Sequence, residues 1–225
     1  MKRFFIGALL LLLFIPTQKT NAQVLSESAK RKVTVGIDLF SDFWTGVPST
    51  VNARVLNQAT NVFLTYNIAV GKSKYTTFGI GLGVGSHNLN LKDGKISDIK
   101  ASDIQLVPAD TSLIKRDKIS LSYLELPLEL KFRGKKGFKF SIGLKIGYLI
   151  GSKEKYIGAL TAGGPQYNIK SKNISQLNTF NYSPIIRIGY KSFNLFASYQ
   201  LVSMFKTGHG PELHPISVGI TLTPF

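Results

Sequence analysis

Residues 123–132 read YLELPLELKF, and this stretch decides the fold. Leucine occupies every second position, and the positions between hold Tyr123, Glu125, Pro127, Glu129 and Lys131. A period of two indicates a β-strand with one apolar and one polar face. A half-buried strand of a soluble protein has this pattern. A strand of a membrane-spanning barrel has it too, with leucines in lipid and carboxylates in the lumen.

The N-terminal 22 residues have the order of a secretory signal peptide. Lys2 and Arg3 precede an apolar run over residues 4–15, and a short polar stretch ends at Ala22. A membrane-spanning helix needs about 20 apolar residues, so this run is too short for one. We predict a signal peptide over 1–22, a short periplasmic segment over 23–31 and an outer-membrane β-barrel over 32–225. A retained N-terminal anchor is the alternative.

Composition excludes several classes of protein. The chain has no cysteine, which excludes disulfides, a thiol nucleophile and a lipoprotein acylation site. Loss of the predicted signal peptide lowers the formal net charge from +16 to +13, because it removes Lys2, Arg3 and Lys19. Most of the remaining bases lie between predicted strands and form no basic helix, so we expect no nucleic-acid partner.

Eight segments of the chain alternate with a period of two. They cover residues 32–44, 61–70, 77–88, 123–132, 138–150, 180–190, 193–204 and 214–225. Most have ten residues or more, close to the roughly 9–11 that a tilted strand needs to cross a bilayer. Strands of soluble proteins are usually about 5–6 residues long.

The connections between these segments alternate in length. Residues 71–75, 133–137 and 191–192 form short turns, whereas 45–59, 89–118, 151–178 and 205–213 form longer loops. Short turns at one end and long loops at the other are typical of outer-membrane barrels. We predict an all-β fold, an eight-stranded antiparallel up-and-down transmembrane β-barrel with an OmpA/OmpX-like architecture and both termini in the periplasm. A soluble lipocalin-like barrel is the alternative.

Aromatic residues favour the membrane interpretation. Six of them flank the short turns: Tyr75, Phe78, Phe132, Phe138, Tyr190 and Phe193. Aromatic girdles mark the lipid–water interface of such barrels, although aromatics favour strands in general. The last residue, Phe225, resembles the terminal aromatic that bacterial barrels present to their insertion machinery. It is out of phase with the apolar positions of the last segment, unless the chain is irregular at Pro224.

The alternation also predicts what fills the lumen. The charged residues expected to point inward are Asp38, Glu125, Glu129, Lys131, Lys139, Lys145 and Arg187. Isolated buried charges are costly, so these three acids and four bases should pair. The alternate glycines between Gly79 and Gly85 should leave room for the long side chains of the segments 123–132 and 138–150. A lumen plugged in this way argues against an open diffusion pore.

The stretch that contains Tyr123, Glu125, Pro127 and Leu128, with the eight strands and the signal ending Asn21-Ala22-Gln23, resembles the PorT-like outer-membrane β-barrel family of Bacteroidetes. A Tyr-(Leu/Ile)-Glu-(Leu/Ile)-Pro-Leu segment recurs on a central strand of that family. The resemblance covers nearly the whole mature chain. It implies an outer-membrane location more firmly than a task, and the founding member is associated with a secretion system for surface proteins.

No catalytic, cofactor-binding or metal-binding residue is predicted. His209, Glu212 and His214 lie in one loop and could bind a metal, but no helix sets their spacing. The alternate glycines after Gly79 precede no helix, so they do not form a dinucleotide-binding motif. We interpret His87 as a residue of the lumen or its rim.

The expected partners are outer-membrane lipids, the barrel insertion machinery through the C-terminal strand, and a periplasmic or secretion-system protein. Nine bases gather at the predicted periplasmic rim: Lys30, Arg31, Lys32, Lys72, Lys74, Arg133, Lys135, Lys136 and Lys191. They could attract acidic lipid headgroups or an acidic partner, or serve solubility alone. The function favoured is that of a non-enzymatic barrel, structural or an interaction platform, with an accessory role in secretion as one option. A transport barrel, a barrel enzyme and a lipocalin-like carrier are the alternatives.

Overall fold

The computed structural model describes residues 32–223 except 74, 160 and 162. The predicted signal peptide, the segment 23–31 and the residues Pro224 and Phe225 lie outside the described residues. No helix among the described residues is long and apolar enough to span a membrane.

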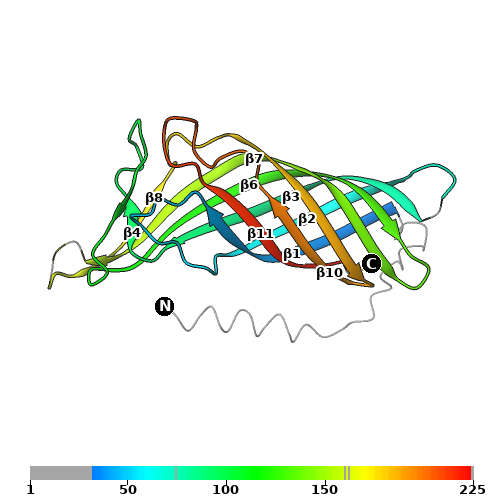
Figure 1. The fold of residues 1–225 in the computed structure, drawn as a ribbon, viewed down its shortest axis with the longest axis horizontal. Coiled ribbons are helices and arrows are strands. Elements are labelled where there is room, and N and C mark those ends of the chain that lie inside the picture. Colours follow the sequence, from blue (N-terminus) through cyan, green and yellow to red (C-terminus); the bar gives the residue numbers. More distant parts are fainter. Residues whose placement is uncertain (1–31, 74, 160, 162, 224–225) are drawn as a thin grey trace, which may run out of the picture.

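Eight antiparallel strands close into a barrel (Figure 1). They are β1 (Val33–Thr45), β2 (Gln58–Ala69), β3 (Thr76–Leu91), β6 (Ile114–Arg133), β7 (Phe138–Ala159), β9 (Phe180–Tyr190), β10 (Phe193–Tyr199) and β11 (His214–Leu222). Each strand pairs with the next of these along the chain, and β11 pairs with β1 to complete the ring. Closure leaves no exposed edge at bilayer depth, which a membrane-spanning sheet requires.

The predicted fold is therefore confirmed, with differences in strand length. β6 has 20 residues and β7 has 22, far more than predicted, so each extends well beyond the length needed to cross a bilayer. β10 ends at Tyr199, earlier than predicted. The predicted long loops hold three further strands: β4 (Gly94–Ile96), β5 (Leu106–Pro108) and β8 (Gln166–Lys172). We call the end with these loops the loop end and the other the turn end.

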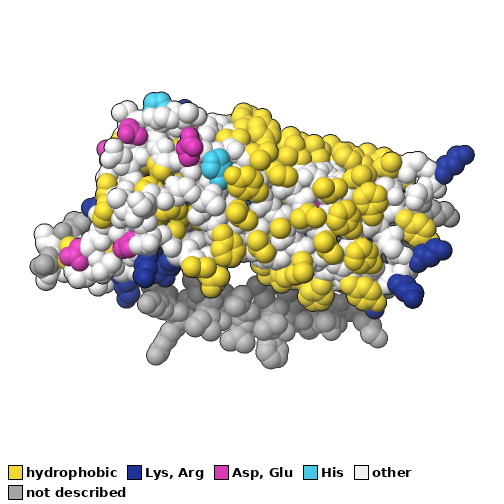
Figure 2. Space-filling view, viewed as in Figure 1, with side chains coloured by type: hydrophobic (Ala, Val, Ile, Leu, Met, Phe, Trp, Pro, Cys, Tyr) yellow, Lys and Arg dark blue, Asp and Glu magenta, His cyan; other side chains and the backbone are white. Residues whose placement is uncertain are grey.

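An apolar belt lies between the two ends of the barrel, and Figure 2 shows it on one face. Its side chains come from the outward positions of all eight strands and include Ile37, Leu39, Val62, Leu64, Ile80, Leu82, Val84, Leu124, Ile142, Ile150, Ile186, Ile188, Leu195, Val218 and Ile220, each more than a third exposed. The leucines of the YLELPLELKF stretch thus lie on the outside. A soluble carrier with an apolar interior is not favoured, because water would face this whole belt.

The polarity of the two faces of β6 inverts beyond Tyr123, while the odd-numbered positions stay buried on both sides of it. On the side of the turn end, Leu124 is 43% exposed and Glu125 faces the lumen. On the side of the loop end, Ile119 and Leu121 are buried and Lys118 lies on the outer face. The part of the barrel next to the loops thus has an apolar interior like that of a water-soluble protein, while the belt region has a polar one.

An apolar cap fills the loop end. Its buried side chains are Val51, Leu89, Leu91, Ile96, Ile104, Leu106, Ile119, Leu121, Tyr123, Ile174, Leu177, Met204, Phe205 and Leu213. Backbone hydrogen bonds join the loops, from Ile104 N to His209 O (3.0 Å) and from Ser175 N to Ile99 O (2.8 Å). Residues 89–118, predicted only as a long loop, thus contribute apolar residues to the cap. Most of the charged residues of this segment are exposed, whereas Asp117 is buried.

Glycines on the inner face of β3 make room for side chains of β6, as predicted, and for those of β2 in place of the predicted β7. A Cβ atom at Gly83 would lie 2.9 Å from both Phe63 Cβ and Val62 O, and one at Gly85 would lie 2.7 Å from Glu125 Oε1. Pro127 has no N–H to donate, and the pairing of β3 with β6 is interrupted beside it, between Ile80–Leu128 and Gly83–Glu125.

Replacement of Gly83 by valine should destabilise the barrel by about 1–3 kcal/mol, because the interior there has no space for a larger side chain. A gel that compares unheated and heated samples in detergent would show unfolding at a lower temperature than in the wild type. Gly151→Val is the matched control, since nothing lies within 4 Å of a Cβ atom at that position. Equal stability of the two variants would contradict the packed interior.

Candidate functional site: a sealed lumen

The lumen of the belt region contains two ionic clusters separated by aromatic rings. The cluster nearer the turn end centres on Arg187 of β9. Its Nη2 bonds to Asp38 Oδ2 at 2.8 Å and its Nη1 to Glu129 Oε1 at 2.6 Å, which joins β9 to β1 and β6. Thr221 donates to Asp38 Oδ1 at 2.6 Å, and Ser141 donates to Glu129 Oε2 at 2.9 Å. Both carboxylates are therefore satisfied by neighbours from several strands.

Two phenyl rings flank the guanidinium group. Its carbon lies 4.8 Å from the ring centre of Phe63 and 5.2 Å from that of Phe196, within the range of cation–π attraction. Phe40 meets Phe196 edge to face, with 5.3 Å between ring centres. These inward-facing rings form an aromatic layer above the first cluster.

The second ionic cluster lies beyond the aromatic layer, nearer the cap. His87 Nδ1 lies 3.0 Å from Asp42 Oδ2, and Lys145 Nζ lies 2.9 Å from Glu125 Oε1. The two pairs approach each other, since His87 Nε2 is 3.6 Å from Glu125 Oε1. All four side chains are almost completely buried.

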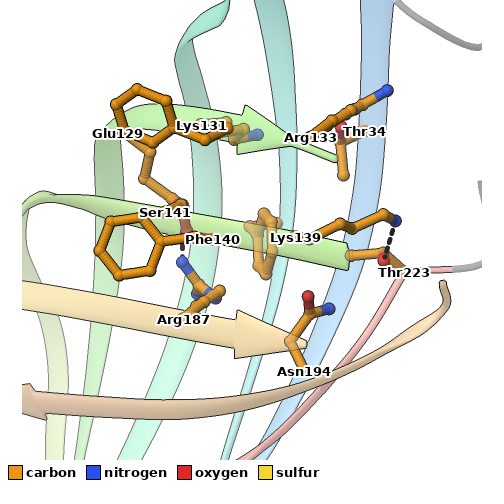
Figure 3. A pocket seen from close by; sticks show the side chains of 12 residues that line it. Thr34, Glu129, Lys131, Arg133, Lys139, Phe140, Ser141, Arg187, Asn194 and Thr223 are labelled. Carbon is orange, nitrogen blue, oxygen red and sulfur yellow. Dashed lines mark hydrogen bonds and ion pairs between the residues drawn. The ribbon is translucent and has the colours of Figure 1, made fainter. Parts of the chain in front are cut away.

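A small pocket lies at the turn end of the lumen, with a volume of about 50 Å³ (Figure 3). Lys131, Lys139 and Arg133 line it together with Glu129 and Arg187. Lys131 donates to Thr65 Oγ1 at 2.6 Å and Lys139 to Thr223 Oγ1 at 3.3 Å. Pockets that bind small molecules usually measure about 300–1,000 Å³, so this one is too small for such a ligand.

The structure brings the seven predicted lumen charges together and adds Asp42 and His87 to them. All seven predicted charges point inward, and Asp38, Glu125, Glu129, Lys145 and Arg187 form ion pairs. Lys131 and Lys139 bond instead to neutral oxygens. Asp42 was missed, although continued alternation along β1 from Asp38 would have placed it inside. His87 lies in the lumen and not at the rim.

The loop histidines do not form a ligand set. His209 Nδ1 lies 2.7 Å from Ser102 O, whereas His214 Nδ1 lies 3.1 Å from Gln200 O and its ring stacks on Tyr199. Within the described part of the chain, no three His, Cys, Asp or Glu residues are arranged to hold a metal ion. The glycines from Gly79 to Gly85 all lie within β3.

A model of the outer membrane protein beta-barrel domain matches residues 40–204. The chain belongs to this family. Membership supports an outer-membrane location, in agreement with the closed barrel and its apolar belt. No curated protein matches the chain.

Among solved structures, the chain is similar to Ail, the attachment invasion locus protein of Yersinia pestis. One structure of Ail, in complex with the heparin analogue sucrose octasulfate, aligns at 9% identity over 85% of this chain and 96% of Ail, with a TM-score of 0.41. A second structure of Ail aligns at 10% identity over 85% of this chain and 95% of Ail, with the same TM-score.

Arg187→Met should cost about 3–5 kcal/mol of barrel stability, because Asp38 and Glu129 would remain buried without their cation. Urea unfolding in detergent, followed by gel mobility, measures the loss. Lys139→Met is the control, since this half-buried lysine has one neutral partner and should cost about 1 kcal/mol or less. Neutralising Asp38 and Glu129 as well, with Asn and Gln, should recover part of the stability. A loss no larger than that of the control would contradict the central role of Arg187.

The cap contains a pair of carboxyl groups, Asp117 and Glu154, beyond the apolar belt. Burial, followed by the charge of Glu154, raises the pKa of Asp117 to about 8, and burial raises the pKa of Glu154 as well. Lys95 opposes the shift of both, and Tyr156 lies opposite Asp117 on β7. Because the folded cap binds a proton that the unfolded chain releases above about pH 4, its stability should fall as pH rises from about 4 to 8.

Fluorescence of Trp44, the one tryptophan in the sequence, which packs against the cap, would report this loss in denaturant titrations between pH 5 and 8. Asp117→Asn should make the stability of the cap nearly independent of pH in this range. Asp110→Asn is the control, because hydrogen bonds from Ser112 lower the pKa of this exposed carboxyl group, which stays ionised throughout. An unchanged slope in Asp117→Asn would contradict the assignment.

Proposed function

We propose that this protein is a non-enzymatic outer-membrane barrel that serves as a structural element or interaction platform, and not as a channel. The observation that carries the proposal is the filled lumen. Ionic, aromatic and ionic layers follow one another from the turn end, and the apolar cap closes the loop end. A solute would have to break buried ion pairs and unpack the cap in order to pass.

The orientation we propose places the turn end and both termini in the periplasm and the loop end outside the cell. An even number of strands returns the chain to the end where it began, and short turns are periplasmic in barrels of this class. Exposed Lys72, Lys135, Lys136 and Lys191 then face the periplasm. The resemblance to PorT-like barrels favours a periplasmic or secretion-system protein as the partner of this basic rim, and the C-terminal strand is the segment we expect the insertion machinery to recognise.

Conductance in planar bilayers tests the closed state. The purified barrel should give no current steps above the bilayer background. A variant in which the apolar cap residues of one long loop are deleted and Arg187 is replaced by glycine should give such steps. Regular openings of the wild type would favour the transport alternative.

Charge neutralisation at Lys72, Lys135 and Lys136 should reduce co-purification of a periplasmic partner. Unchanged recovery of the partner would exclude this basic rim as its binding site.

A further inference from the structure

The outer wall of the barrel carries a concentrated positive charge beyond the apolar belt, near the loop end. We call it the basic wall. It consists of Arg54, Arg116, Lys118, Lys153, Lys155, Lys170 and Lys172. The last four lie on β7 and β8, Arg116 and Lys118 lie on β6, and Arg54 comes from the loop between β1 and β2.

Strand register places these lysines directly opposite one another. Lys118 pairs with Lys155, which pairs with Lys170 on β8, and Lys153 pairs with Lys172 in the next row. Residues that pair across antiparallel strands share a face of the sheet, and like charges in such pairs are destabilising. Burial lowers the pKa of Lys118, and the charges of Arg116, Lys153 and Lys155 lower it further. The row therefore carries repulsion that nothing on the strands relieves.

No acid on this wall compensates for the repulsion. The acidic residues on the same stretches of β6 and β7 are Asp117 and Glu154, and their alternation turns them toward the cap. In the described part of the chain, the ion pairs lie in the lumen and involve none of these seven bases. Repeated like charge without a protein partner indicates an anionic ligand.

A hollow at one end of the wall offers convergent donors. Arg54, Arg116 and Lys118 line it with Gln58 and Asn90, and its volume is about 240 Å³. Arg116 Nη2 donates to Asn90 Oδ1 at 3.3 Å, which orients the guanidinium group. A water molecule takes up about 30 Å³ in the liquid, so the hollow has room for a phosphate group and its hydration.

The position of the wall indicates where the anion comes from. The wall continues the lipid-facing surface of the same strands, so it faces sideways, along the membrane plane, and not up from the loop tips. Lys153 lies three residues past Ile150, the last exposed apolar residue of β7. At about 3.3 Å per residue along a tilted strand, this places it roughly 10 Å further on, at the level of lipid headgroups.

We propose that the basic wall binds the phosphate groups of lipid headgroups in the leaflet that surrounds the loop end. The lysine rows contact several phosphates at once, and Arg54 with Arg116 holds one in the hollow. Phosphate fits because it presents several anionic oxygens to lysine and arginine donors. The proposal depends on the belt lying in a bilayer, and not on the platform function proposed above.

Lipid retention tests this proposal. Tagged barrel is folded in mixed micelles with bis-phosphorylated lipid A, captured, washed, and analysed for lipid bound per protein. The triple variant Lys118→Gln, Lys155→Gln, Lys170→Gln should bind lipid A at least about tenfold more weakly than the wild type, because each lysine near an anionic surface contributes favourably to binding. The matched control is Lys72→Gln with Lys135→Gln and Lys136→Gln, which removes three charges at the turn end and should bind like the wild type. A gel mobility shift on heating verifies that each variant is folded.

Further samples in the same retention experiment test whether the bound phosphate belongs to a lipid headgroup. Dephosphorylated lipid A should be retained poorly by the wild type, and retention of lipid A should fall as salt rises from 50 to 500 mM. If the triple variant does not fold, the single variant Lys170→Gln on the exposed edge strand and the salt series carry the test. Equal loss in both triple variants, equal retention of dephosphorylated lipid, full competition by millimolar inorganic phosphate, or binding of a soluble sulfated polysaccharide in place of lipid would each overturn the proposal.

Discussion

Arg187 holds together strands that are far apart in sequence. Its guanidinium group bonds to Asp38 on the first strand and to Glu129 near the middle of the chain, between the rings of Phe63 and Phe196. A cation buried in this way is tolerated only where its partners are in place, so the pairing favours one closed arrangement of β1, β6 and β9. Small residues on the inner faces of β3 and β7 follow from the same narrow interior, because a Cβ atom at Gly83 would lie against Phe63 and one at Gly143 against Glu129, the two neighbours of Arg187.

The barrel meets two solvents, and its sequence changes where they change. In the belt region lipid surrounds the wall, so the apolar side chains point outward and the polar ones pair inside. Beyond Tyr123 the wall leaves the hydrocarbon for a polar environment, and the same strand turns Leu121 and Ile119 inward while Lys118 lies outside. The loops complete the second arrangement by contributing apolar residues to the cap. This change of pattern along the strands produces both a sealed lumen and an outer wall that extends beyond the belt. Both features fit a protein that acts through its surfaces.

Much of this structure could be predicted from alternation alone. The inward direction of Glu125, Glu129, Lys145 and Arg187 follows from one parity on each strand, and so does the role of the glycines after Gly79. Asp42 was missed because large aromatics surround it and blur the two faces of β1. The lengths of β6 and β7 were underestimated because the polarity pattern changes along each strand. Toward the turn end their outward positions hold apolar residues, whereas toward the loop end the outward positions hold polar ones, although the strand continues without a break.

The sequence by itself determined the barrel, its strand number, the lipid-facing side of each strand and the charges of the lumen, because a period of two is a local property that one strand displays alone. Tertiary structure decided which charges meet, that the loops form a cap, and that Lys118, Lys155 and Lys170 share one row. These features depend on the register between strands and on contacts between residues far apart in the sequence, such as Arg187 with Asp38, which are 149 positions apart. No local pattern encodes them, because they arise only when the ring of strands closes.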